Sequence, residues 1–450
     1  MAFPHILSPR AAQVAHLSRQ IESFDVLPPV QQRAIQAHAL RSLLRWAATH
    51  SQFWRVRLPS LVEGDSFDPF TVLREIPPLS RIELQTQFDA LSCAHAMPEG
   101  TRITLAHSNG TTGQPVAVQK ELEAYRLRYL AYSLQTTNWH RLDVAQTLLK
   151  FGARVQDTMQ AHWGAPDALF FETGPLYLRQ SMDRDLAELY ASLVEARPAY
   201  VVSGGSVIHA IARYALQQPE EGRPSIRAIL STGENATEAL REDCLAAFGA
   251  RVIDRYSNEE MGWLAVQCPN SNHLHVMSSN VYVEIVDDDG RPCPVGVPGR
   301  VLLTGLHSEA MPLIRYDVGD VAEWGEACGC CHLQLPVIGR LWGRQREFLR
   351  TPDGQMRHII IFAERFLEIA PVLDMRFRYY SNPLLRFELV AQTPISLEQR
   401  SALEAVAREM VGHDCPVEIV ELDRIQWGAT DKRNPFLDMG VSWPVEHGER

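Results

Sequence analysis

The sequence predicts a large α/β domain followed by a small α+β domain. Over most of the chain, short apolar runs alternate with segments of helical spacing, a pattern typical of a sheet covered by helices. After residues 345–348 the expected order changes to β-α-β-β-α-β. The chain has 450 residues, of which 46% are apolar and 22% charged, so it is long enough to bury more than one core.

The first part of the chain is expected to be scaffold. Apolar residues recur at helical spacing over residues 11–48, and Pro28 and Pro29 interrupt the run. Residues 67–88 contain three prolines and are interpreted as a loop-rich connector.

The middle of the chain carries the expected α/β arrangement. A helix is predicted over 121–137, a buried strand over 226–230, and a further strand over 251–255. The turn at 231–235 opens a helix that runs to Phe248. Ligands of open α/β sheets bind outside the carboxyl ends of the strands, which is where such turns lie. Two more strands are expected at 281–287 and 300–304, and the second leads to residues 315–320. Asp320 is interpreted as a buried residue at a strand end, where its carboxylate could accept from two sugar hydroxyls.

A run rich in glycine and hydroxyl groups precedes a strand-like segment and consists of Ser108, Asn109, Gly110, Thr111, Thr112 and Gly113. Glycines let backbone N–H groups approach a phosphate, and the hydroxyls add donors. A Walker loop would continue with lysine and a helix, whereas Gln114 and Pro115 follow here. Taken alone, the run is equally typical of a polar turn between two strands.

The C-terminal domain is predicted to span residues 345–450, after an N-terminal domain over 1–344. Its strands are expected at 359–361, 375–380, 385–391 and 417–422, and its helices at 397–411 and before Ala370.

Charge and composition restrict the partners. The net charge is −11, with no basic tract, so nucleic acid and anionic membrane are not expected partners and small ligands are. No apolar run is long enough to span a bilayer, and the N-terminus lacks signal-peptide character, so a cytoplasmic location is expected. Only Lys120, Lys150 and Lys432 are lysines. Codon bias accounts for such scarcity, but a retained lysine also hints at a need for a compact ammonium.

Several further motifs follow the glycine-rich run in order: the turn at 231–234, residues 256–262, residues 315–320, Gly343 with Arg344, and Lys432. In this order they resemble the adenylate-forming enzymes, and within them the phenylacetate-CoA ligase-like branch, from about Leu40 to the end.

The resemblance implies roles for these residues. Residues 108–113 would hold the β and γ phosphates of ATP. Asp320 would accept from both ribose hydroxyls and Glu260 would hold Mg²⁺. Further cofactor-binding residues would be Gly233, Glu234, Tyr256, Ser257 and Arg344. Of these, Gly233, Glu234 and Tyr256 would flank the adenine, and Arg344 would be the arginine that closes the first domain.

The catalytic residues implied by the resemblance are Glu260, Arg344 and Lys432. Lys432, carried on a mobile C-terminal domain, would contact the carboxylate and the α-phosphate. Attack of a carboxylate on the α-phosphorus accumulates negative charge, which a cation delivered by domain closure stabilises. Three departures from the family pattern are Gln114, Asp431 before Lys432, and Glu259 beside Glu260, which leaves open which glutamate holds the metal.

The cysteines suggest a second metal. Eight cysteines in a chain without an export signal are expected to be reduced. Thiolates and an imidazole make a tetrahedral Zn²⁺ site, and relatives in the branch carry a structural zinc. The alternative is that the thiols are ordinary buried groups. The expected ligands are Cys268, His275, Cys328 and Cys330, with His273 and Cys331 as alternates.

The function expected from the resemblance is ATP-dependent, AMP-forming activation of a carboxylic acid, which the branch suggests is aromatic. The acyl-adenylate would then pass to a thiol, with CoA as the co-substrate. Transfer to an amine or a carrier-protein thiol is one alternative, and a degenerate nucleotide-binding protein is another. The cofactors would be ATP, Mg²⁺, CoA and structural Zn²⁺, and a second copy of the chain is the expected macromolecular partner, in a homodimer.

Overall fold

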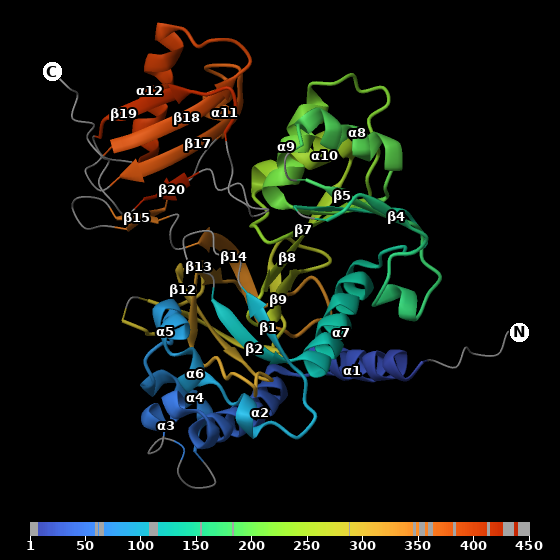
Figure 1. Ribbon diagram of the computed structural model, residues 1–450, viewed down its shortest axis with the longest axis vertical. Helices are drawn as coiled ribbons and strands as arrows, with labels where there is room; N and C mark the ends of the chain where they lie inside the picture. Colours follow the sequence, from blue (N-terminus) through green and yellow to red (C-terminus); the bar gives the residue numbers. More distant parts are fainter. Residues whose placement is uncertain are drawn as a thin grey trace, which may run out of the picture. The chain divides into compact units, whose positions relative to one another are not determined.

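The computed structural model describes residues 8–58, 62, 67–107, 116–153, 155–181, 184–287, 289–344, 348–350, 356–358, 363–380, 384–411, 415–425 and 436–439. The chain divides into two compact units, Met1–Trp342 and Gly343–Arg450. The division lies two residues before the boundary expected after residue 344. The larger unit is α/β and the smaller is α+β, as predicted (Figure 1). None of the helices in the described ranges combines the length and the apolar character needed to cross a membrane.

The N-terminal scaffold is helical and is interrupted where the prolines predict. The first helices are α1 (Pro9–Asp25), α2 (Pro29–His50) and α3 (Gln52–Arg57). The hydroxyl of Ser8 accepts a hydrogen bond from the Ala11 N–H at 3.2 Å and caps α1. Ser51 caps α3 in the same way, which directs the fully buried Trp54 into the core.

The interpretation of residues 67–88 as loop-rich was wrong. The segment forms α4 (Pro69–Glu75), α5 (Arg81–Thr86) and the start of α6 (Phe88–Leu91). Pro69 occupies the first turn of α4, where its missing N–H costs nothing, and Asp68 caps that helix. Ser80 and Glu83 form a reciprocal capping box at α5. A short 3₁₀ turn, η1 (Ala94–Ala96), follows.

A sheet of twelve described strands forms the centre of the larger unit, in the order β11-β12-β13-β14-β10-β9-β8-β7-β6-β3-β5-β4. Five adjacent strands of this sheet are parallel to one another, in the order β5-β3-β6-β7-β8. The bounds are β3 (Leu148–Gly152), β4 (Thr158–Gln160), β5 (Leu176–Gln180), β6 (Tyr200–Gly204), β7 (Ala228–Thr232), β8 (Arg251–Asn258), β9 (Gly262–Gln267), β10 (Leu274–Val276), β11 (Val281–Val286), β12 (Gly299–Gly305), β13 (Tyr316–Trp324) and β14 (Val337–Arg344).

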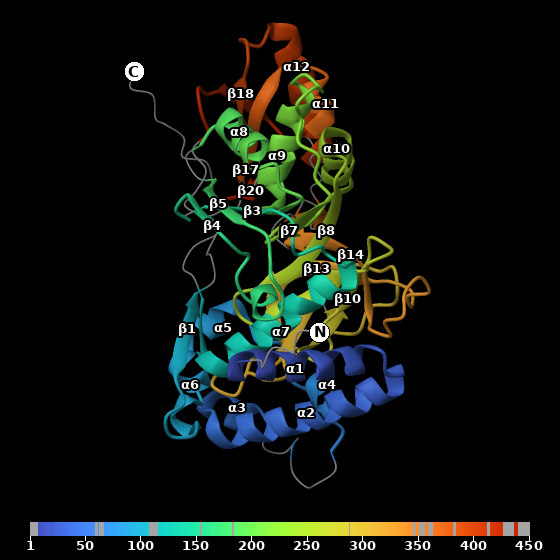
Figure 2. The same ribbon diagram turned by 90° about the vertical axis from the view of Figure 1, so that its right-hand side faces the viewer.

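Three helices pack on the parallel strands: α8 (Leu186–Ala196), α9 (Gly205–Leu216) and α10 (Glu238–Phe248), while η2 (Asp167–Leu169) lies before β5. Figures 1 and 2 show these helices gathered beside β5 and β7. The helix predicted to end at Phe248 is confirmed, and Gly249 follows it in the left-handed conformation, with φ 66°. The predicted strand 251–255 is also confirmed, but it continues to Asn258, so the first three residues of the motif at 256–262 belong to the strand.

The hairpin β1 (Ile103–His107) and β2 (Ala117–Glu121) flanks residues 108–115, which lie outside the described residues. The predicted helix at 121–137 is α7 (Leu122–His140). Helices α1 and α7 lie side by side in both views (Figures 1 and 2), and Val14, Ile21 and Tyr132 share one buried cluster between them.

Asp25 at the end of α1 is a buried acid. It is 1% exposed, and its carboxylate oxygens have no hydrogen-bond partner among the described residues. Burial, with a smaller effect of Glu22, raises the pKa of Asp25 to about 8. Because the folded state keeps this proton where the unfolded state loses it, the stabilising contribution is complete below about pH 4 and is lost as the pH rises to about 8.

Asp25→Asn should therefore unfold at a higher urea concentration than the wild type at pH 8, and the difference should shrink at pH 5. The slope is about 1.4 kcal/mol for each pH unit between those limits. Glu75→Gln, which makes the corresponding acid-to-amide change at an exposed residue of the same unit, is the control and should leave the pH dependence almost unchanged. Parallel curves for Asp25→Asn and the wild type across this range would contradict the expectation.

The smaller unit contains a four-stranded sheet in the order β19-β18-β17-β20, covered by α12 (Leu397–Val411). Phe377 and Phe387 stack in its core with ring centroids 4.4 Å apart. The strands are β17 (Val372–Tyr380), β18 (Leu384–Ala391), β19 (Val417–Glu421) and β20 (Phe436–Asp438), preceded by β15 (Phe348–Arg350), β16 (Met356–His358) and α11 (Ala363–Leu367). The predicted strand at 359–361 lies outside the described residues, and β20 was not predicted.

Candidate active site and cysteine cluster

Tyr256 and Asp320 meet at the candidate nucleotide site. The Tyr256 hydroxyl donates to Asp320 Oδ2 at 2.6 Å, and the two residues are 7% and 6% exposed. Strands β9, β10 and β14 separate β8 from β13 in the sheet order, so the sheet must curve to allow this contact. The structure thus brings together two residues that are 64 positions apart in the chain.

The expectation that Asp320 lies at a strand end was wrong, because it lies within β13. The register between β12 and β13 shifts between Arg300 and Leu302, and Gly319 has φ 76°. Such an irregularity redirects a side chain in the middle of a strand, as bulges beside active sites commonly do. No pattern in the sequence predicted that β13 continues to pair with β12 on both sides of this register shift.

Glu260 lies in the tight turn between β8 and β9. It is 6% exposed, and the Tyr316 hydroxyl donates to its Oε1 at 3.4 Å, whereas Glu259 is exposed. The side-chain oxygen of Asn258 accepts from the Met261 N–H at 2.8 Å and closes the turn. Of the two adjacent glutamates, only Glu260 points into the protein.

Gly233 and Glu234 follow β7 directly. Gly233 has φ 77°, and Thr232 pairs with Arg255, so Gly233 lies next to Tyr256 across the two strands. The Glu234 carboxylate accepts from the Ser206 N–H and, at 3.0 Å, from the Ser206 hydroxyl. Glu234 therefore caps the N-terminus of α9. Ser257 is the penultimate residue of β8.

A pocket that includes about 470 Å³ of space, counting its open mouth, lies between β2, α7 and the Glu260 turn. Aromatic side chains line it beside two carboxylates and two cations: Tyr125, Tyr129, Trp263, Glu121, Glu260, Lys120 and Arg128 are among its residues. Sequence reasoning assigned no site role to any of these except Glu260. The scarcity of lysine was the one signal that pointed to Lys120.

Lys120 is 5% exposed, and its ammonium donates to the backbone carbonyl of Glu259. The same ammonium lies 3.6 Å from the centroid of the Tyr125 ring. Burial lowers the pKa of Lys120 to about 8, while Glu259 and Glu260 act in the opposite direction. The ammonium thus belongs to the same group of contacts as the acidic turn.

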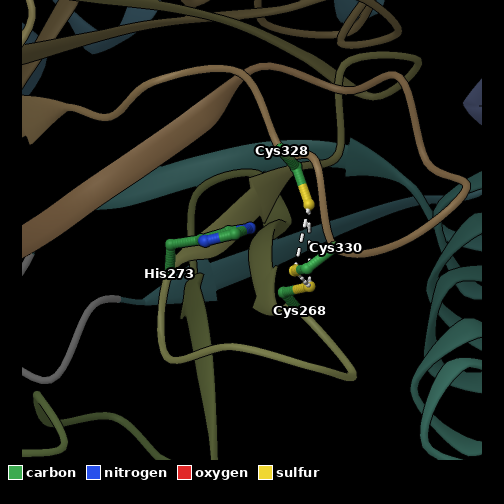
Figure 3. A group of neighbouring side chains, drawn as sticks. All are labelled: Cys268, His273, Cys328 and Cys330. Atoms are coloured by element: carbon green, nitrogen blue, oxygen red, sulfur yellow. Dashed lines mark hydrogen bonds between the residues drawn. The ribbon is translucent and has the colours of Figure 1, made fainter.

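The cysteine cluster lies elsewhere in the larger unit. Cys268 follows β9, and three other thiols lie between β13 and β14. The sulfur of Cys268 is 3.6 Å from that of Cys330, and the sulfur of Cys328 is 3.4 Å from those of Cys330 and Cys331. Figure 3 shows Cys268, Cys328 and Cys330 converging, with the His273 ring directed towards them.

Two overlapping four-residue groups have ligand atoms within 4.8 Å of one another: Cys268, His273, Cys328 and Cys330, and Cys268, His275, Cys328 and Cys331. Neither is the expected set, which combined His275 with Cys330; each group contains one of the expected alternates, His273 or Cys331. His275 Nε2 instead lies 3.3 Å from the sulfur of Cys331. His273 and His275 are two residues apart and share one side of an extended segment, so spacing alone did not choose between them.

The surroundings of His275 suit a metal ligand. Burial lowers its pKa to about 4, so the imidazole is neutral at pH 7, the form that binds metals. Trp139 near the end of α7 packs edge-on against its ring, with centroids 6.0 Å apart. Any ion at this cluster would therefore also support the C-terminal end of α7.

Known proteins similar to this chain include ligases. No protein-family model matches it. A phenylacetate-coenzyme A ligase of Thermus thermophilus is 26% identical over 337 residues, which cover 70% of this chain and 72% of the relative. The protein of that name from Escherichia coli is 25% identical over 301 residues, covering 65% and 67%. In sequence, the chain is similar to phenylacetate-coenzyme A ligases, the branch of the adenylate-forming enzymes that its motifs resemble.

Solved structures of CoA ligases share the fold. A 2-hydroxyisobutyryl-CoA ligase in the postadenylation state, in complex with 2-HIB-AMP, has a TM-score of 0.71 at 18% identity, covering 92% of this chain and 91% of the other. An anthranilate CoA ligase in complex with anthranoyl-AMP has a TM-score of 0.54, covering 73% and 64%. Several residues implied by the family resemblance lie outside the described part of the chain, namely residues 108–113 and Lys432, together with the side chain of Arg344.

Proposed function

We propose that this chain activates a carboxylic acid with ATP to an acyl-adenylate and pyrophosphate, and then transfers the acyl group to CoA. The observation that carries the proposal is the contact of Tyr256 with Asp320, in a fold shared with ligases whose complexes hold acyl-adenylates. The names of the sequence relatives support CoA, rather than an amine or a carrier protein, as the acceptor.

The nucleotide roles follow from the surroundings of each residue. Asp320 is buried and already accepts one charge-assisted hydrogen bond from Tyr256, and it would accept from the ribose hydroxyls. Gly233 beside Tyr256 leaves room for the adenine. Glu260, buried where Glu259 is exposed, is the glutamate that would hold Mg²⁺, which when bound neutralises phosphate charge. Residues 108–113, Arg344 and Lys432 keep the roles that the resemblance implies.

The acid is proposed to be aromatic. Tyr125, Tyr129 and Trp263 gather around the pocket that Glu260 also lines, and the Tyr129 and Trp263 rings lie 5.9 Å apart. Aromatic side chains offer a flat, apolar surface on which a ring packs favourably. The phenylacetate-CoA ligase name of the relatives supports the same substrate class.

The cysteine cluster is proposed to hold one structural Zn²⁺. A tetrahedral ion with Zn–S bonds of about 2.3 Å would separate its sulfur ligands by about 3.8 Å. The sulfur separations of 3.4 to 3.9 Å in the cluster are close to this value. Three cysteines and one histidine match a common structural ligand set and leave no position open for chemistry.

Pyrophosphate release tests the function. The protein, MgATP and a panel of aromatic and aliphatic acids should give acid-dependent pyrophosphate, with an aromatic acid the best substrate. Mass spectrometry after adding CoA, an amine or a carrier protein should find the acyl group on CoA. Absence of pyrophosphate with every acid would contradict the proposal, and an acyl-amine or an acylated carrier protein would change the acceptor.

Asp320→Ala tests the site assignment within the same assay. Loss of a charge-assisted hydrogen bond costs about 1.5 to 3 kcal/mol, so the concentration of ATP needed for half-maximal rate should rise at least about tenfold. Asp317→Ala, three residues earlier on β13, is the control, because its carboxylate pairs with Arg300 instead. Unchanged ATP dependence in Asp320→Ala would show that the nucleotide lies elsewhere.

A further inference from the structure

The turn that carries Glu260 is held from more than one side. Tyr316 donates to the Glu260 carboxylate, and the Asn258 side chain closes the turn. At the far end, Gly262 has φ 79°, and a Cβ added there would lie 3.5 Å from Cε2 and the hydroxyl oxygen of Tyr125. The Tyr125 side chain on α7 therefore packs directly on the turn.

Lys120 contacts the turn at its other end. Its ammonium donates to the carbonyl of Glu259, which belongs to the same planar peptide unit as the N–H of Glu260. A hydrogen bond that fixes this carbonyl therefore also fixes the orientation of the peptide plane that joins Glu259 to Glu260. The two residues are 139 positions apart, so the contact ties β2, which follows residues 108–115, to the acidic turn.

The position of Lys120 is also electrostatically specific. Burying an ammonium is costly, and here the carbonyl, the face of the Tyr125 ring and the two glutamates offset that cost. The positive charge of Arg128 repels the ammonium of Lys120 and lowers its pKa, in the opposite direction to the two glutamates. Adjacent carboxylates repel each other, so one ammonium beside Glu259 and Glu260 reduces the local negative charge. Lys120 and Glu260 line the same pocket.

We propose that Lys120 is a positioning residue for adenylation, which orients the peptide between Glu259 and Glu260 and offsets their charge so that Glu260 faces the reaction in one orientation. The inference rests on the role of Glu260 under the proposed function. A purely structural role, in which Lys120 only attaches β2 to the turn, predicts instead a loss of stability that is independent of Glu260.

Lys120→Met keeps the aliphatic stem and removes the ammonium. Residues that orient a metal-binding carboxylate typically contribute 10- to 100-fold, so the single-turnover rate of acyl-adenylate formation should fall by about that factor. Lys150→Met makes the same change at an exposed lysine of β3 and should stay within about twofold of the wild type. Lys120→Gln, also neutral but polar, should lose a similar factor and decides the question if the Met variant does not fold.

A double-mutant cycle separates positioning from general support. If Lys120 acts through Glu260, adding Lys120→Met to Glu260→Gln should cost less than about twofold more, because the group that it positions is already absent. Additive losses, or normal adenylation in both Lys120 variants, would overturn the inference while acid-dependent pyrophosphate release still upholds the proposed function. Normal adenylation in Glu260→Gln would overturn both this inference and the role given to Glu260. A wild type that releases no pyrophosphate would overturn the function itself.

Discussion

Replacing Lys432 with alanine should slow acyl-adenylate formation by about two to three orders of magnitude. Attack of a carboxylate on the α-phosphorus places developing negative charge on the phosphate, and removal of one preorganised contact to such a charge costs about 3 to 4 kcal/mol. Lys432 lies outside the described residues, in the polar stretch Ala429-Thr430-Asp431-Lys432-Arg433, and its role is a proposal from the family resemblance. Stopped assays of acyl-adenylate and pyrophosphate would measure the loss.

The two half-reactions should respond differently. ATP affinity should change little in Lys432→Ala, because the lysine is proposed to act on the transition state and not on bound nucleotide. Transfer to CoA from a supplied acyl-adenylate should proceed at nearly the normal rate. Arg433→Ala changes the neighbouring cation and should remain active. Equal loss in both half-reactions would indicate damage to the smaller unit. Normal adenylation in Lys432→Ala would show that Lys432 has no role in the reaction.

Loss of the proposed zinc should cause the largest change in stability. Elemental analysis of protein purified without chelator should find about one zinc per chain. Both candidate ligand groups share Cys268 and Cys328, so Cys328→Ser should release the metal and lower the melting temperature clearly. The smaller unit has its own core and should unfold independently of this change.

A matched pair of variants identifies the ligand group. If His273 and Cys330 bind, Cys330→Ser should lose zinc and Cys331→Ser should keep it. If His275 and Cys331 bind, the results should be reversed. The buried position of His275 favours the second group. Well-folded protein that contains no zinc would remove the proposal altogether.

The helices at 69–91 show how local patterns mislead. Prolines mark a loop when they break a helical pattern, but Pro69 begins a helix, and a proline at that position is stabilising. The capping pair Ser80 and Glu83 was present in the sequence as a helix-start signal and outweighs the nearby prolines. The capping residues in the local sequence therefore predict these helices correctly, whereas the prolines alone do not.

The C-terminal unit shows the opposite case. Helix α12 has the predicted bounds because its apolar residues, such as Leu403, Ala407 and Val411, recur at helical spacing and pack on the sheet. Strand β20 has only three residues and pairs in parallel with β17, at Phe377 with Phe436. A strand this short has no period of its own, and its pairing partner defines it.

The sequence by itself determined the order of the elements, the two-part organisation, and the residue types available for chemistry, because these depend on periodicity and on side chains in short local stretches. It also placed Glu260, Asp320 and the cysteines among the candidates. Only the tertiary structure decided which of Glu259 and Glu260 is buried, and which histidine lies beside Cys330 or Cys331. It alone brought Lys120 to the acidic turn. Each of these outcomes depends on contacts between residues far apart in the chain, whose register is set by how the curved sheet and its helices pack.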